Sequence, residues 1–280
     1  MEDNRSLSPR QKIEQSIIKK FRRELWRPFI KGVQEFELIE EGDHIAVAMS
    51  GGKDSLLLAK LLQELKRHGK VSFELSFISM NPGYLPEIVE TVWHNAELCG
   101  IPLEMFDTEV FAVAEELGGE KPCYLCARMR RGNLYAKARE LGANKLALGH
   151  HLDDVVETVL LNVLFGSSYK TMMPKLHSTN FEGMELIRPM TYIREEDIRS
   201  WVRYNGLTPI DCACVVTQRS NFGAREYVKG LLPKLREEIP NVDASLFNSA
   251  RNVELGAILG YKDLEGDYHS FLDHYEERGK

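Results

Sequence analysis

Short apolar runs that alternate with stretches of helical periodicity are the feature that most restricts the folds open to this chain. The runs cover residues 45–49, 73–80, 103–106 and 145–148. Helical patterns follow them, at 54–67, 87–98, 128–141 and 153–165. Strands separated by helices in this way predict an α/β fold with a doubly wound, mainly parallel sheet that is covered by helices on both faces.

The two ends of the chain are predicted to add helices to this sheet. Apolar residues recur near the helical period over 10–31. After a polar connection at 166–180 and a short strand at 185–190, further helices are expected at 195–204, 225–238 and 243–259. We therefore divide the chain into an N-terminal helical segment, a central domain and a C-terminal helical region, at 1–40, 41–215 and 216–280.

Composition places the chain among ordinary globular proteins. It has 280 residues, of which 43% are apolar and 28% are charged. No apolar run approaches the roughly 20 residues that span a bilayer, and the N-terminus lacks the layout of a signal peptide. We therefore expect a cytoplasmic protein with no membrane partner.

Charge is unevenly distributed along the chain, although its formal net value is −6. Residues 1–31 carry nine Lys and Arg against four acids, and residues 121–140 carry six against one. Basic patches of this kind permit a polyanion partner on one face. Solvated helix faces explain the same pattern equally well.

The segment Ser50-Gly51-Gly52-Lys53-Asp54-Ser55 directly follows the first predicted strand and opens the next helix. Two glycines let the backbone approach a ligand, and the free N–H groups of a helix start bind phosphate. Lys53 neutralises phosphate charge, both serines donate hydroxyl hydrogen bonds, and Asp54 suits Mg²⁺ bridged to the phosphates. The spacing is not that of a Walker A motif. It predicts an ATP site, the alternative being a glycine turn with Asp54 as a helix cap.

A second polar loop, Gly149-His150-His151-Leu152-Asp153-Asp154, ends the fourth predicted strand. The carboxyl ends of parallel strands share one edge of the sheet, so this loop, the first loop and Asn81-Pro82-Gly83 are expected to converge there. The helix dipole and a capping box of Asp154 with Glu157 explain one carboxylate. They do not explain both aspartates and the paired histidines, so a functional role of this loop is favoured over capping.

The five cysteines suit metal binding or catalysis better than disulfides in a cytoplasmic protein. Cys123 and Cys126 have the spacing of metal ligands, whereas Cys99 lies in an apolar helix and is expected in the core. Together with Cys212 and Cys214 they permit a zinc site, an iron–sulfur cluster on three thiolates or a redox pair. The Cys-x-Cys spacing of the downstream pair is poor for zinc.

The predicted helix after Cys126 is basic, with arginines at positions 128, 130 and 131. Helical spacing predicts one face that carries Arg128, Arg131, Tyr135 and Arg139 and a buried face that carries Leu134, Ala138 and Leu141. A thiol cluster beside a basic face with an aromatic residue suits sulfur chemistry on a nucleic acid. A solvated basic helix beside a zinc site is the alternative.

The letters of residues 50–55 are those of the PP-loop ATP pyrophosphatases, which cleave ATP between the α and β phosphates. With the segments 122–132, 148–154 and 187–190, the chain resembles the tRNA 2-thiocytidine synthetase family from about residue 13 to 236. The resemblance implies a PP-loop (adenine nucleotide alpha hydrolase-like) fold at 41–215. It also implies replacement by sulfur of the C2 oxygen of a cytidine at tRNA position 32, with AMP and pyrophosphate released.

The resemblance also implies the cofactors, partners and site residues. A [4Fe-4S] cluster is held by Cys123, Cys126 and Cys212, since Cys212 rather than Cys214 follows the matching Pro-Ile stretch. Catalysis is assigned to these cysteines with Asp54 and Asp154, Mg²⁺ to Asp54, and tRNA contacts to Arg128, Arg130 and Arg131. The implied ATP-binding residues are Ala48, Ser50, Gly51, Gly52, Lys53, Asp54, Ser55, Met80, Gly149, His150 and Asp153. The implied partners are tRNA and either sulfide or a sulfur donor such as a cysteine desulfurase, with a homodimer as one option for assembly.

Three other functions fit parts of the same pattern. A PP-loop ligase that forms an amide or lysidine uses the same adenylation with an amine nucleophile. A thiolase for another base or tRNA position is the second alternative, although the extra zinc-finger modules of the related 2-thiouridine-54 enzymes are absent. A nucleotide-binding module with a structural zinc site needs no catalysis.

Overall fold

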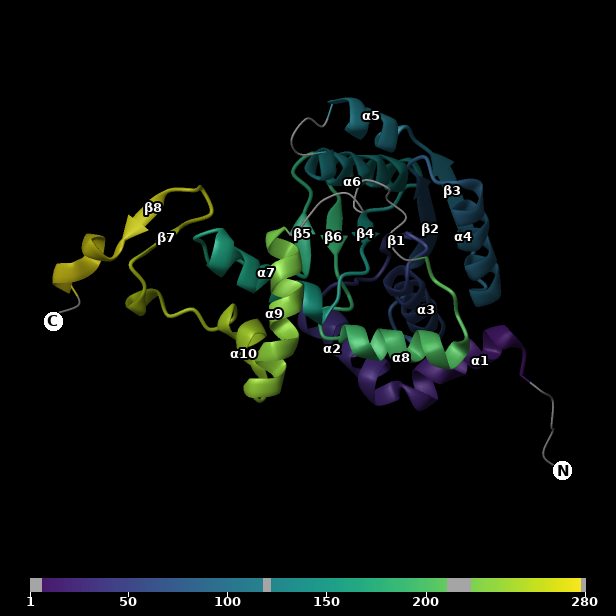
Figure 1. Cartoon of the computed structure of the whole chain (residues 1–280), viewed down its shortest axis with the longest axis horizontal. Helices are drawn as coiled ribbons and strands as arrows, with labels where there is room; N and C mark the ends of the chain where they lie inside the picture. The colour runs from purple at the N-terminus through teal and green to yellow at the C-terminus, as the bar shows by residue number, and fades with distance from the viewer. Residues whose placement is uncertain (1–6, 118–121, 211–222, 278–280) are drawn as a thin grey trace.

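The computed structural model of the protein describes residues 7–117, 122–210 and 223–277, and a six-stranded sheet lies at its centre (Figure 1). The strand order is β3-β2-β1-β4-β6-β5, and every pair is parallel except β5 with β6. The strands are β1 (His44–Ala48), β2 (Glu74–Asn81), β3 (Leu103–Asp107), β4 (Lys145–Ala147), β5 (Lys175–His177) and β6 (Glu185–Ile187). The predicted mainly parallel α/β sheet is confirmed.

Helices cover both faces of the sheet because alternate residues of its buried strands point to opposite sides. On β1, Ile45 and Val47 pack into the core that contains α3, whereas Ala46 packs into the core that contains α6. The helices within and around the sheet are α3 (Lys53–His68), α4 (Pro86–Cys99), α5 (Val110–Leu117), α6 (Pro122–Glu140), α7 (Leu152–Phe165) and α8 (Glu195–Asn205).

The N-terminal helical segment belongs to the same core as the sheet. Its elements are α1 (Pro9–Gln15), two π-helical turns, η1 (Ser16–Lys20) and η2 (Arg22–Trp26), and α2 (Arg27–Glu35). Ile17, Leu25 and Phe29 are fully buried with residues of β1 and α3. The helical character predicted at 10–31 is confirmed and extends to residue 35, but the segment is not one continuous helix, because it is interrupted at Phe21.

The C-terminal part differs from the prediction at two places. The expected polar connection at 166–180 contains β5, which pairs antiparallel with β6. The helices α9 (Ala224–Glu238) and α10 (Val242–Ser249) follow, but the helix predicted at 243–259 is wrong beyond residue 249. Gly256 weakens that stretch as a helix, and Leu255 and Leu259 are 51% and 78% exposed, so no core stabilises it.

The chain ends in a hairpin that projects away from the sheet, at the left of Figure 1. The hairpin pairs β7 (Gly260–Lys262) with β8 (Tyr268–Ser270). The short 3₁₀ helix η3 (Leu255–Ala257) precedes it, and the 3₁₀ helix η4 (Phe271–Glu277) follows it. Among the described residues, no helix has the length and apolar character that crossing a membrane requires.

Candidate active site

A cavity of about 440 Å³ opens at the carboxyl ends of β1, β2 and β4. Strand order reverses between β1 and β4, and ligands of open parallel sheets bind at such a point. The structure brings most of the predicted site residues to this cavity: Ala48, Ser50, Lys53, Asp54, Ser55, Met80, Arg130, Arg131, Gly149, His150 and Asp154. Gly51, Gly52, Arg128 and Asp153 do not line it.

The phosphate loop, residues 50–55, turns tightly from β1 into α3. Gly52 is the N-cap of α3, and no side chain caps this end, so Asp54 does not have the capping role weighed above. Gly51 has a φ of +78°, and a Cβ there would lie 2.6 Å from a methyl carbon of Val92. Ile210 donates its backbone N–H to the Gly51 carbonyl oxygen over 3.1 Å.

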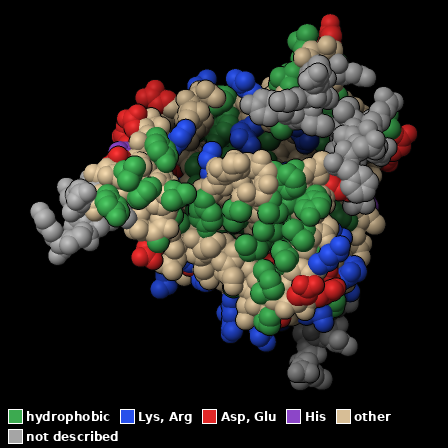
Figure 2. Space-filling model, turned by 60° about the vertical axis from the view of Figure 1, so that its left-hand side comes forward, with side chains coloured by type: hydrophobic (Ala, Val, Ile, Leu, Met, Phe, Trp, Pro, Cys, Tyr) green, Lys and Arg blue, Asp and Glu red, His purple; other side chains and the backbone are tan. Residues whose placement is uncertain are grey.

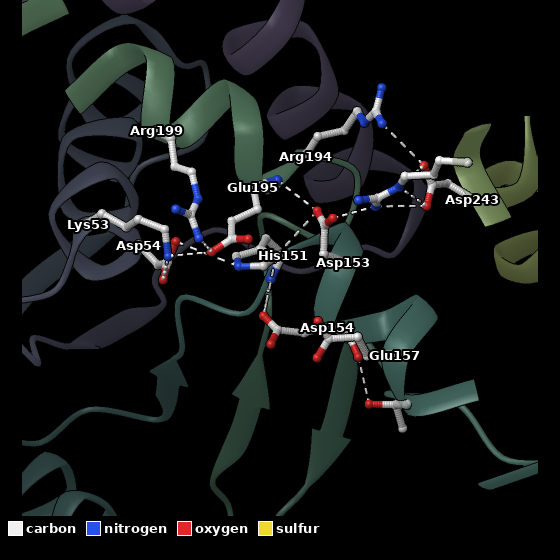
Figure 3. Close-up of polar contacts among 12 residues, drawn as sticks. Lys53, Asp54, His151, Asp153, Asp154, Glu157, Arg194, Glu195, Arg199 and Asp243 are labelled. Carbon is white, nitrogen blue, oxygen red and sulfur yellow. Dashed lines mark hydrogen bonds and ion pairs between the residues drawn. The ribbon is translucent and has the colours of Figure 1, made fainter. Parts of the chain in front are cut away.

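Lys53 is held between two carboxylates at the mouth of this loop. Its Nζ lies 3.0 Å from Asp54 Oδ2 and 2.9 Å from Glu195 Oε1 on α8 (Figure 3). Burial alone would lower the pKa of Lys53, but the two carboxylates raise it. Burial raises the pKa of Glu195, and the stronger effect of Lys53 and Arg199 brings it to about 2. The lysine is therefore fully charged where phosphate would bind.

The loop at residues 149–154, here the acidic loop, packs against the start of α3. A Cβ on Gly149 would lie 3.1 Å from the carbonyl carbon of Asp54 and 3.2 Å from the backbone nitrogen of Ser55. His150 is also enclosed, and Arg188 donates from Nε to His150 Nδ1 over 3.3 Å. Burial lowers the pKa of His150 to about 4, so this imidazole is neutral at physiological pH.

His151 connects the phosphate loop to the start of α7. Its Nε2 lies 3.7 Å from Asp54 Oδ1, and its Nδ1 lies 3.5 Å from Asp154 Oδ2 (Figure 3). The His151 backbone N–H donates to Asp154 Oδ2 over 3.0 Å. His151 is therefore the N-cap of α7, and Asp154 forms the capping box with His151. The predicted capping box of Asp154 with Glu157 is wrong.

Asp153 points away from the cavity and joins three helices. Its Oδ2 accepts the backbone N–H of Glu195 over 2.7 Å, and its Oδ1 pairs with Arg236 of α9. Arg236 also donates from Nε to Asp243 Oδ2 of α10 over 3.0 Å. Burial opposes ionisation of Asp153, but these donors lower its pKa. Its contacts are those of a structural carboxylate, unlike those of its neighbour Asp154.

The basic helix α6 borders the cavity at the end that carries the cysteines. Arg130 and Arg131 line the cavity, whereas the partly exposed Cys126 does not. Cys123 lies on the same helix, Cys212 and Cys214 lie outside the described residues, and Cys99 is fully buried as predicted. Over the described ranges, no group of three His, Cys, Asp or Glu residues is arranged to hold a metal ion.

Helical spacing predicted that Tyr135 lies on the exposed face of the arginines, and this prediction is wrong. It is only 6% exposed and stacks on Phe181 with the ring centroids 5.1 Å apart. Phe181 packs against the core on this side of the sheet. Tyr135 points into that core because its ring buries apolar area against Phe181 there.

Comparison with known proteins gives the family of the chain. The PP-loop domain family matches residues 18–213. The tRNA-cytidine(32) 2-sulfurtransferase of Syntrophotalea carbinolica is 42% identical over 229 residues, which are 80% of this chain and 86% of that protein. The enzyme of the same name from Anaeromyxobacter is 35% identical and covers 91% of this chain and 82% of its own length. The chain belongs to the tRNA-cytidine(32) 2-sulfurtransferase family.

A solved structure shows the same fold as this family member. It is the U34-tRNA thiolase NcsA from Methanococcus maripaludis with its [4Fe-4S] cluster. The TM-score is 0.66 at 22% sequence identity, and the match covers 88% of this chain and 83% of that chain. The predicted PP-loop fold is confirmed.

Three charged residues at the cavity of this sulfurtransferase family member were not predicted from the sequence. Glu157, Glu195 and Lys229 all line it. Glu157 was assigned to a helix cap, although its position one turn after Asp154 placed it on the same face of the helix. No local pattern connects Glu195 with Lys53, and Lys229 lies on α9 beyond the matched PP-loop domain.

Proposed function

We propose that the protein is an ATP-dependent tRNA sulfurtransferase that replaces the C2 oxygen of a cytidine, at position 32, with sulfur. The observation that carries the proposal is that the phosphate loop, the acidic loop and the arginines of α6 converge on one cavity. Cys123 and Cys126 lie on the same helix, α6. The names of the relatives support tRNA and cytidine as substrates. A tRNA substrate also supports a cytoplasmic location.

ATP is proposed to bind with its phosphates on residues 50–55 and its base near Ala48 and Met80, which line the same cavity. Lys53 exchanges Glu195 for phosphate oxygens. Asp54 Oδ1 is buried and has no hydrogen-bond partner among the described residues. A buried carboxylate oxygen without a partner fits Mg²⁺, which prefers oxygen ligands. Asp54 would hold the ion, which would neutralise charge on the phosphates.

Adenylation supplies the leaving group for the exchange. The cytidine leaves its stack to reach the cavity, as base-modifying enzymes require. Its C2 oxygen attacks the α-phosphorus of ATP, and the bond to pyrophosphate breaks. Hydrosulfide then attacks C2, the C2–O bond breaks and AMP leaves. Asp154, which lines the cavity, is proposed to accept the proton that hydrosulfide loses. No net oxidation or reduction occurs.

The thiolates are proposed to hold a [4Fe-4S] cluster through Cys123, Cys126 and Cys212. The residues fit such a group in two respects. Cys126 is partly exposed beside Arg130, and Ile210, two positions before Cys212, contacts the phosphate loop. Such a cluster, held by these three thiolates, would supply the bound sulfide for the exchange. The sulfide itself comes from solution or from a donor protein such as a cysteine desulfurase.

The decisive experiment uses protein purified without oxygen, tRNA transcripts, ATP and sulfide. Nucleoside mass spectrometry of the tRNA is expected to show 2-thiocytidine, and the protein is expected to contain iron with a broad visible absorbance. Cys123→Ala should retain ATP binding while iron and product are lost, and Cys212→Ser should do the same. Cys214→Ser is the matched control and should retain both. Normal 2-thiocytidine formation by Cys123→Ala would contradict the cluster.

We also propose that the protein forms a homodimer through the end of α7 and the adjacent face of α9. Val163, Leu164 and Phe165 are each at least 50% exposed, and Tyr227 is 59% exposed and contacts Phe165 edge-on. Figure 2 shows a band of apolar side chains across this side of the molecule. Sedimentation analysis should give a dimer for the wild type and a monomer for Leu164→Glu; a monomeric wild type would reject the proposal.

A further inference from the structure

Two cations of α9, Lys229 and Arg225, lie at the cavity but outside the matched PP-loop domain. Lys229 lines the cavity, and the guanidinium of Arg225 faces two carboxylates that line it. Arg225 Nη2 lies 3.7 Å from Asp154 Oδ1, and Arg225 Nε lies 3.8 Å from Glu157 Oε2. The match to the PP-loop domain ends at residue 213, so α9 adds positive charge that the motifs of that domain do not account for.

The packing of α9 on α7 directs both cations toward the mouth of the cavity. Val228 and Leu232 are buried in one cluster with residues of α7. Arg225 and Lys229 are four positions apart, so they share a face of the helix, and this face adjoins the buried one. Both residues are exposed, and the side chain of Arg225 is 57% exposed. The two cations therefore lie where a large ligand can reach them.

Neither cation has a strong contact within the described part of the chain. The contacts of Arg225 are longer than hydrogen bonds, and Lys229 forms no hydrogen bond or ion pair with a described residue. Burial raises the pKa of Glu157 although Lys229 and Arg225 counteract the rise, so the two cations do not fully compensate this carboxylate. They remain available to an anion from outside the fold.

ATP is not the expected source of that anion. Its phosphates are proposed to bind at residues 50–55, next to Lys53. Figure 3 shows Asp154 and Glu157 on the other side of His151 from Lys53. A phosphate of ATP that left the phosphate loop for the α9 cations would lie next to these two carboxylates, which repel it.

A nucleotide that leaves its stack brings phosphates to the same place. The base enters the pocket while the sugar–phosphate backbone stays at its mouth. Lys and Arg bind such phosphates without reading the base. A backbone phosphate approaches Lys229 and Arg225 from the solvent, so the cations lie between it and the carboxylates of α7.

The arginines of α6 lie at the same cavity but on a different wall. Arg130 and Arg131 line it from a helix that packs in one apolar cluster, whereas α9 packs in another cluster with α7. A nucleotide has a phosphate on each side of its sugar. With its base in the cavity between α6 and α9, it can have one phosphate at each helix.

We propose that Lys229 and Arg225 bind the backbone phosphate on one side of the target cytidine of tRNA. This inference rests on the function proposed above and adds α9 to the surface that holds the substrate. The contact anchors the strand at the mouth while the base enters the cavity, and the arginines of α6 serve the other side of the nucleotide.

The first test measures how salt weakens tRNA binding to the wild type and to the double variant Arg225→Gln/Lys229→Gln. Glutamine keeps the helix propensity and removes the charge. One contact with a phosphate of a single strand contributes about 0.7 to the slope of log K against log salt concentration. We expect the double variant to lose about 0.7 from that slope and about 3- to 10-fold in tRNA affinity at low salt. Its affinity for ATP, measured by calorimetry, should not change.

The matched control is the double variant Lys234→Gln/Lys262→Gln. It changes the net charge by the same amount at two exposed lysines that do not line the cavity, one of them on α9. This control should keep the salt slope and the tRNA affinity of the wild type.

The second test uses tRNAs in which one phosphate beside nucleotide 32 is replaced by a neutral methylphosphonate, on each side in turn. A 2′-deoxyribose next to the replaced linkage keeps it stable, and the control tRNA has the same sugar with an ordinary phosphate. On one of the two neutral-linkage tRNAs the wild type should bind as weakly as Arg225→Gln/Lys229→Gln, because the anion that the two cations contact is gone. On the control tRNA the difference should remain.

The outcomes separate this inference from the proposed function. A wild type that forms no 2-thiocytidine rejects the function, whatever its affinity for tRNA. An active wild type with the same salt slope as Arg225→Gln/Lys229→Gln rejects the inference alone, and so does a difference that persists on both neutral-linkage tRNAs. Weaker ATP binding by that variant, or an equal loss of tRNA affinity in the control variant, also rejects it, because the cations would then bind ATP or act only through net charge.

Discussion

Gly149→Ala should disturb the candidate site more than its single methyl group suggests. The new Cβ would meet three backbone atoms, the carbonyl carbon and oxygen of Asp54 and the nitrogen of Ser55, at 3.1, 3.2 and 3.2 Å. Ordinary carbon contacts lie at about 3.5–4.0 Å. These atoms belong to the first turn of α3, so no side-chain rotation relieves the overlap, and the acidic loop and the phosphate loop must separate.

The expected cost is that of an overpacked core, about 1–3 kcal/mol in the free energy of unfolding. For a chain of this size it corresponds to a fall in Tm of about 2–10 °C. The loops need to separate by only a few tenths of an ångström. The rate of AMP formation should therefore fall, but by less than the roughly 100-fold that a displacement near 1 Å can cause. Thermal unfolding and a pyrophosphate-release assay measure the two effects.

Gly132→Ala on α6 is the matched control. A Cβ at Gly132 meets no atom within 4 Å, and alanine is the better helix former by about 1 kcal/mol. This variant should be as stable as the wild type or slightly more so, with unchanged pyrophosphate release. If Gly149→Ala had the Tm and the rate of the wild type, close contact between the two loops would not be needed for the site.

Three other perturbations have calculable directions. Glu14→Gln removes the carboxylate that lies 3.1 Å from the fully buried Lys60 and should lower the free energy of unfolding in urea by about 3–5 kcal/mol. Adding Lys60→Met should restore most of this loss, and no recovery would contradict pairing as the cause. Because Glu195 has a pKa of about 2 in the folded protein and 4.5 normally, its contribution to stability is complete above pH 4.5 and is lost as the pH falls toward 2. Glu195→Gln should therefore lose less unfolding free energy than the wild type between pH 5 and pH 3, and an unchanged pH dependence of that free energy would refute the argument. Asp153→Asn should lower the unfolding free energy by about 1–3 kcal/mol with little change in ATP affinity by calorimetry, whereas a large loss of affinity would make Asp153 an ATP ligand.

The sequence predicted the sheet well because periodicity and loop chemistry are local. The runs at 45–49 and 145–148 and the helices between them depend on neighbouring residues, and so does the position of the phosphate loop. The errors lie where distant contacts decide. The strand β5 needs β6 as a partner, and the stretch after residue 249 remains outside any core although its apolar spacing suits a helix.

The site shows the same division between local and distant causes. Motif letters identified Lys53, Asp54 and Asp154 because each belongs to a strand-to-helix loop. The burial of Tyr135 depends on Phe181, and the partner of Lys53 on α8 is more than 140 positions away in the chain. No periodicity contains such information, so those contacts became visible only in the folded chain.

The different directions of Asp153 and Asp154 explain why two adjacent carboxylates begin α7. Successive helix residues point about 100° apart, so one carboxylate can line the cavity only if the other faces the neighbouring helices. Asp153 receives Arg236 from α9 and holds the backbone N–H of Glu195, whose carboxylate holds Lys53. A residue beyond the matched PP-loop domain thus orients the lysine of the phosphate loop through three successive contacts, and the geometry of the ATP site depends on where α9 packs.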